Sequence, residues 1–110
     1  MPMPLFAAAF AVRFGGATAA FECPRHFSEV QALIDRVGAS VDRARDRMAW
    51  HSIALVHGLL DDARMQLEAA RRDHERPQGP WDHARAFAKA DTALGYARAA
   101  QIVQARCTHP

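Results

Sequence analysis

The fold is decided by residues 48–106, which read MAWHSIALVHGLLDDARMQLEAARRDHERPQGPWDHARAFAKADTALGYARAAQIVQAR. Midway through this stretch, residues 76–80 read RPQGP. Pro77 has no backbone N–H to donate, and it disfavours helical angles at the residue before it. The Gly-Pro pair that follows is typical of the end of one helix and the first turn of the next. The sequence therefore predicts two helices separated by a turn at residues 76–80.

Apolar and small residues recur at alternating spacings of four and three on both sides of this turn, which is the period of one helix face. Before the turn, the series comprises Ala49, Ile53, Val56, Leu60, Ala63, Leu67 and Ala70, and its next position is His74. After the turn, it comprises Ala84, Phe87, Ala90, Leu94, Ala97 and Gln101, widened by Ala88, Ile102 and Ala105. A turn of about four or five residues makes the two helices antiparallel neighbours, so residues whose numbers sum to about 156 should lie side by side.

A further helix is predicted to begin at Phe27. Ser28 followed by Gln31 is a capping-box pattern, and Phe27 stands where a hydrophobic staple would pack. One apolar face follows, and it comprises Val30, Leu33, Ile34, Val37, Val41, Ala44 and Met48. The predicted fold is thus all-α, a small three-helix bundle built on a long antiparallel helical hairpin.

The sequence offers two places where this first helix could end. Gly38 followed by Ser40 suits the C-terminus of one helix and the N-cap of the next. A break near Asp46 is the alternative, but neither glycine nor proline marks it. We therefore predict that the first helix ends near Gly38 and that the second runs from Val41 to Arg76.

The composition is that of one globular domain, with 110 residues, 50 % of them hydrophobic and 24 % charged. We expect residues 21–110 to form this domain. A domain so small buries only about 60 to 65 % of its unfolded surface, so an oligomer, a disulfide or a bound partner would add to its stability. The net charge is only +2 and the acidic residues are interleaved with the arginines. Nucleic-acid binding is therefore not expected.

Residues 1–20 differ in composition from the rest, because they contain no acid and carry an apolar run from Leu5 to Val12. A span of the bilayer takes about 20 residues, so no stable membrane insertion is expected from this run. Its length, and the Ala-Thr-Ala at residues 17–19, suit a secretory signal, although no Lys or Arg precedes it. We predict a periplasmic or secreted protein. The alternative is a cytoplasmic protein in which residues 1–20 form a flexible apolar N-terminal arm.

Cys23 and Cys107 lie near the two ends of the predicted domain. In an exported protein two cysteines suggest one disulfide, which in the entropic account would stabilise a loop of this length by about 4 kcal/mol. In an up-down-up bundle, however, these ends lie far apart, and Cα atoms more than about 7 Å apart cannot be bridged. An intramolecular bond, an intermolecular bond and free thiols are all compatible with the sequence.

Histidines at the turn form a candidate metal site. His74 closes the apolar series of the second helix, and Asp82 is expected across the turn from it with His83 alongside. Two imidazoles and a carboxylate suit Zn²⁺, Cu²⁺ or Ni²⁺, with Glu75 within reach as a further ligand. The alternative is a structural lock, because His74 and Asp82 are each favoured by the dipole of their own helix end.

Trp81 and Tyr96 are candidates for contact with a partner protein. Trp81 follows the proline that starts the third helix, where an indole either covers the end of the core or, if exposed, serves as an interface anchor. The third helix is rich in alanine, which allows close approach either within one bundle or by a second chain.

Catalysis is not expected, because no nucleophile, base and orienting group can be assembled from this sequence. We expect a non-catalytic interaction or accessory module that binds a partner protein or a second copy of itself. The competing hypothesis is a transition-metal-binding protein that uses the histidines at the turn. Apart from such a divalent metal ion, no cofactor is expected.

Overall fold

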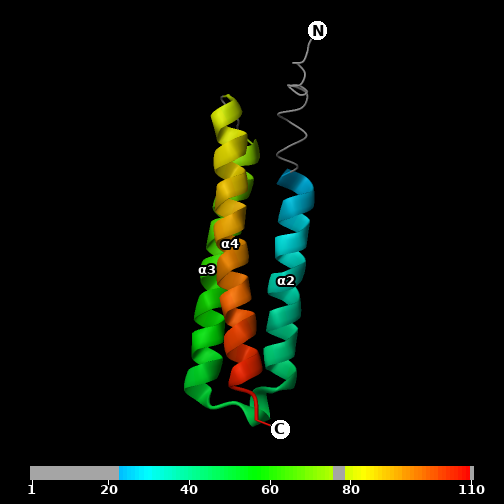
Figure 1. Cartoon of the computed structure of the whole chain (residues 1–110), viewed down its shortest axis with the longest axis vertical. Coiled ribbons are helices and arrows are strands. Elements are labelled where there is room, and N and C mark those ends of the chain that lie inside the picture. Colours follow the sequence, from blue (N-terminus) through cyan, green and yellow to red (C-terminus); the bar gives the residue numbers. More distant parts are fainter. Residues whose placement is uncertain (1–22, 76–78, 110) are drawn as a thin grey trace.

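The computed structural model describes residues 23–75 and 79–109, and in this part of the chain it contains helices and no strand. The elements are α2 (Cys23–Arg43), the short 3-10 helix η1 (Arg45–Arg47), α3 (Trp50–Glu75) and α4 (Pro80–Arg106). Figure 1 shows α2, α3 and α4 lying side by side, with consecutive helices running in opposite directions. The predicted all-α three-helix architecture is confirmed. The predicted secretory signal, residues 1–20, lies outside the described residues, so export stays a prediction.

The turn between α3 and α4 follows the predicted pattern, because α3 ends at Glu75 and α4 begins at Pro80. Gly79 is the N-cap residue, and its carbonyl accepts a hydrogen bond of 3.1 Å from the backbone N–H of Asp82. Proline suits the first helical position because its missing N–H would have no intrahelical partner there. The carboxylate of Asp82 in the first turn is favoured by the helix dipole.

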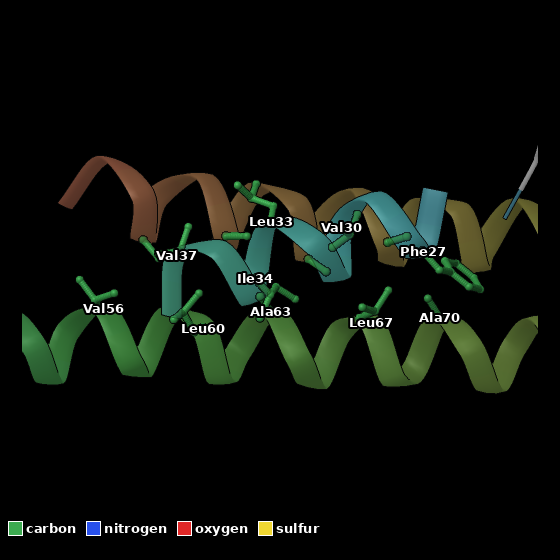
Figure 2. Close-up of a cluster of buried hydrophobic side chains, with 14 of the residues drawn as sticks. Phe27, Val30, Leu33, Ile34, Val37, Val56, Leu60, Ala63, Leu67 and Ala70 are labelled. Carbon is green, nitrogen blue, oxygen red and sulfur yellow. The ribbon is translucent and has the colours of Figure 1, made fainter. Parts of the chain in front are cut away.

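The core lies along the whole length of the helices. All seven positions predicted to form the apolar face of the first helix are buried. Figure 2 shows side chains of α2 directed toward α3, where Val56, Leu60, Ala63 and Leu67 face them. α4 contributes a different kind of surface, since its buried residues between Trp81 and Arg106 are all alanine. They are Ala86, Ala90, Ala93, Ala97 and Ala100.

The predicted apolar stripe of α4 is rotated relative to the observed one. Gln101 and the three widening positions, Ala88, Ile102 and Ala105, are exposed, whereas Ala86 and Ala93 are buried instead. The cause is the composition of the helix. Alanine occurs on nearly every side of α4, so hydrophobicity distinguishes its faces only weakly and the periodicity could not fix its rotation.

The predicted break near Gly38 is wrong, because α2 continues through Gly38 to Arg43. A glycine inside a helix costs only about 1 kcal/mol, and burial of Val37 and Val41 on either side outweighs that cost. The chain reverses instead near Asp46, where η1 ends in extended backbone at Met48. The second helix therefore begins at Trp50 rather than at Val41.

The start of α2 also differs from the prediction. The helix already includes Cys23, four residues before Phe27. Ser28 is therefore an exposed residue inside the helix rather than its N-cap. The capping-box pattern was present in the sequence but is not used, because the face of Phe27 and Val30 extends back to the buried Cys23.

The end of the chain is tied to the α2–α3 connection. The backbone N–H of His109 donates to the carbonyl of Arg47 at 2.9 Å. In Figure 1 the red C-terminal end accordingly lies against the segment that joins α2 and α3. This bond fixes the open end of the hairpin to the rest of the bundle.

Replacing Gly38 by Ala is expected to stabilise the protein by about 0.5 to 1 kcal/mol, because alanine restricts the unfolded chain and favours helix. A Cβ at this position would lie 3.9 Å from the nearest side-chain atoms, of Arg64 and Leu60, which is ordinary contact. Urea denaturation measures the effect. The matched control is Gly79→Ala, outside the helix in extended backbone, which should change stability less. Destabilisation by Gly38→Ala would show that the space between Gly38 and the side chains of Arg64 and Leu60 does not admit a methyl group.

Candidate metal centre

Three helices bring Cys23, His74 and His83 together at the end of the bundle that holds the α3–α4 turn. The Cys23 sulfur and one ring nitrogen from each histidine all lie within 4.8 Å of one another. Cys23 is the first residue of α2, His74 lies in the last turn of α3, and His83 lies in the first turn of α4. Cys23 is fully buried and both imidazoles are half-buried. The cluster therefore sits at the edge of the core, with access from solvent on the histidine side.

Ring packing holds the two imidazoles in place. The rings of His74 and His83 meet edge to face, with centroids 5.3 Å apart. Phe27, one helical turn after Cys23, presents its ring to His74 in the same manner at 5.7 Å. The Cys23 thiol points to the start of α4, since its Sγ lies 3.8 Å from the backbone carbonyl oxygen of His83. The three side chains are thus oriented toward one another by contacts among α2, α3 and α4.

Burial raises the pKa of the Cys23 thiol, because the thiolate would lose its hydration in the core. Without a metal the thiol is therefore protonated at neutral pH and makes a weak hydrogen bond. A metal ion would have to displace this proton in order to bind the sulfur.

Salt bridges beside the cluster join α3 to α4. Asp73 pairs with Lys89 at 2.8 Å and lies 3.8 Å from Arg85, which also pairs with Asp82. The Asp73 and Lys89 side chains are largely shielded from solvent, which makes their pair stronger than a fully exposed one. These pairs hold His74 and His83 in register across the turn.

Of the three residues predicted as ligands, the structure brings two together. His74 and His83 meet as expected, but Asp82 is directed to Arg85 and is not part of the close group, whose third member is Cys23. Sequence reasoning missed Cys23 because the first helix was predicted to start after it. Its position four residues before Phe27 puts the two on one helix face, and this spacing was the available signal.

The two cysteines lie at opposite ends of the bundle, and both are free thiols. Cys23 is beside His83 at the start of α4, whereas Cys107 follows the end of that helix. The rise of about 1.5 Å per residue separates these ends by about 36 Å. An intramolecular disulfide does not fit this arrangement.

The two aromatic residues predicted to contact a partner lie in different environments. Trp81 is 78 % exposed, so it does not cover the end of the core. Tyr96 is half-buried and packs against the core. A contact between His26 and Phe87 was not predicted from the sequence. His26 of α2 stacks on Phe87 at 4.4 Å and bonds Asp91 at 2.8 Å, which ties α2 to α4.

Comparison with known proteins returns no family model, no curated protein and no solved structure that matches this chain. Among the described residues, no helix is both long and apolar enough to cross a membrane.

Proposed function

We propose that this protein binds one transition metal ion through the Cys23 thiolate and the imidazoles of His74 and His83. The observation that supports the proposal is the convergence of three ligand atoms, from three helices, within 4.8 Å of one another. Zinc bonds of about 2.3 Å to sulfur and 2.0 to 2.1 Å to nitrogen put tetrahedral ligand atoms about 3.3 to 3.6 Å apart. Side-chain rotations that move the ligand atoms by about 1 Å would therefore bring Cys23, His74 and His83 to the geometry of a zinc site.

The donor set limits the choice of metal. One thiolate and two imidazoles suit Zn²⁺ and copper, whereas Mg²⁺ and Ca²⁺ prefer oxygen ligands. Three protein ligands leave the fourth position of a tetrahedral zinc ion for water or an external ligand. We assign binding rather than a reaction, since the sequence provides no nucleophile and base to act beside the ion.

Cobalt substitution tests the proposal directly. Co²⁺ added to the metal-free protein should produce thiolate-to-cobalt charge-transfer absorption, and native mass spectrometry should find one metal ion per chain. Cys23→Ser should abolish the absorption, whereas Cys107→Ser, the matched control at the far end of the bundle, should retain it. No absorption in the parent, or equal loss in both variants, would remove the proposal.

Metal affinity is expected to rise with pH. The raised pKa of Cys23 keeps the thiol protonated through the neutral range, so each bound ion releases that proton. Affinity should therefore increase by about thirtyfold from about pH 6.5 to about pH 8 through the thiol alone. Competition titrations with a chelator of known affinity measure this dependence. A pH-independent affinity would show that Cys23 is not a ligand.

A second candidate function is self-association or contact with a partner protein through Trp81. Its 78 % exposure supports this reading, because tryptophan is enriched among interface anchors. Sedimentation over a range of concentrations tests for self-association, which Trp81→Ser should weaken. Trp50→Ser is the matched control, because Trp50 is 79 % exposed at the opposite end of α3. If the parent protein is strictly monomeric, self-association is excluded and only contact with a different protein remains as a role for Trp81.

A further inference from the structure

A groove with a volume of about 240 Å³ lies between the C-terminal halves of α2 and α4, away from the metal centre. Its walls are formed by Arg36, Val37, Ser40 and Arg43 of α2, and by Gln101 and Gln104 of α4. A water molecule takes about 30 Å³ in the liquid, so the groove has room for a ligand of several heavy atoms. It is therefore large enough for a small molecule rather than for a single ordered water.

The spacing of the lining residues explains why their polar groups converge. Arg36, Ser40 and Arg43 are four and three residues apart, so they lie on one side of α2. Gln101 and Gln104 are likewise three residues apart on α4. The side chain of Gln104 donates to the Thr108 hydroxyl at 3.0 Å, which fixes it as a wall of the groove.

The charges in the groove are of one sign. Its lining contains two arginines and no acid. Within residues 23–75 and 79–109, neither Arg36 nor Arg43 makes an ion pair. Of the acids adjacent to these arginines in the sequence, Asp35 accepts from Gln31 at 3.0 Å and Asp42 pairs with Arg45 at 3.3 Å. Two arginines thus line the same groove, and no carboxylate is among its lining residues.

We propose that this groove binds a phosphate-type oxyanion, either free phosphate or a phosphoryl group on a small organic molecule. Arg36 and Arg43 supply planar donor pairs that match phosphate oxygens. The Ser40 hydroxyl and the Gln101 amide add neutral donors between them. Two arginines in the lining favour a ligand that carries more than one negative charge.

Calorimetric titration at low salt tests the site, with inorganic phosphate and glycerol 3-phosphate as the two probes. The parent should bind at least one of them saturably at one per chain, and the tighter probe distinguishes free phosphate from an esterified group. Arg36→Gln with Arg43→Gln should weaken binding by about tenfold or more, because charge-assisted bonds are lost. Both residues are exposed, so circular dichroism should show an unchanged helix content.

Arg98→Gln is the matched control, because Arg98 is exposed on α4 and does not line the groove. It should leave phosphate binding unchanged. Cys23→Ser should also leave phosphate binding unchanged, and that result would separate the groove from the proposed metal centre. The proposal is overturned by absence of saturable binding of either probe to the parent. It is also overturned if Arg98→Gln weakens binding as much as the double variant, since that result would indicate general charge attraction.

Discussion

Addition of Zn²⁺ is expected to raise the Tm of the metal-free protein by about 10 to 20 °C once free zinc exceeds its Kd by about 100-fold. An ion that binds only the folded state stabilises it by about 2.7 kcal/mol at that ratio. Zinc is expected to bind only the folded state, because Cys23, His74 and His83 come from three helices and the unfolded chain does not bring them together. Thermal melts followed by circular dichroism, with zinc and with a chelator, measure the shift.

Substitutions locate the origin of this stabilisation. Cys23→Ser, His74→Ala and His83→Ala should each remove most of the zinc-dependent shift. His51→Ala should retain it, because His51 is exposed at the opposite end of α3. A shift that survives all three ligand substitutions would show that zinc binds elsewhere. If zinc does not change the Tm of the parent protein, the metal proposal is wrong.

Replacing Leu60 by Ala is expected to lower the free energy of unfolding by about 2 to 5 kcal/mol. Leu60 is fully buried, and Figure 2 shows it on α3 facing α2. Small domains have a total stability of only about 5 to 15 kcal/mol, so this single change removes a large share of it. The fully buried side chains of α4 from Trp81 to Arg106 are all alanine, which has no rotatable side chain that could turn into the cavity.

Leu55→Ala is the matched control for this prediction. It removes the same atoms from the same helix, but Leu55 is 53 % exposed. Its effect should stay within about 0.5 kcal/mol. Urea denaturation of both variants gives the comparison. Similar losses from the two substitutions would mean that burial of Leu60 between α2 and α3 does not dominate the stability.

The helical hairpin could be predicted from the sequence because its signals are local and strong. The proline-containing turn at residues 76–80 and the large apolar side chains of α3 each specify their structure without reference to distant residues. The apolar face of α2 was likewise correct, since Val30, Leu33, Ile34 and Val37 contrast with charged neighbours. The rotation of α4 was not predictable in this way, because alanine gives little contrast between faces.

The candidate metal centre was only partly predictable for a related reason. His74 and His83 lie near each other in the chain, and the turn alone brings them together. Cys23 reaches them only through the packing of α2 on the hairpin, and its distance in sequence from either histidine leaves no local pattern. The boundaries of α2 were misassigned at both ends, because Gly38 and Ser28 carry local signals that core burial overrides.

The all-alanine inner face of α4 also bears on how the hairpin keeps its alignment. A slip of α4 along α3 by one turn, about 5.4 Å, would replace most of the fully buried alanines by another alanine, so it is chiefly the partly buried Phe87, Leu94, Tyr96 and Val103 that would oppose it through their size. Such a slip would separate His83 from His74 and break the pair between Asp73 and Lys89. The alignment of α4 along α3 therefore depends strongly on contacts at the two ends of the hairpin, between His74 and His83 at one end and between His109 and Arg47 at the other. A metal ion bound by His74 and His83 would oppose such a slip.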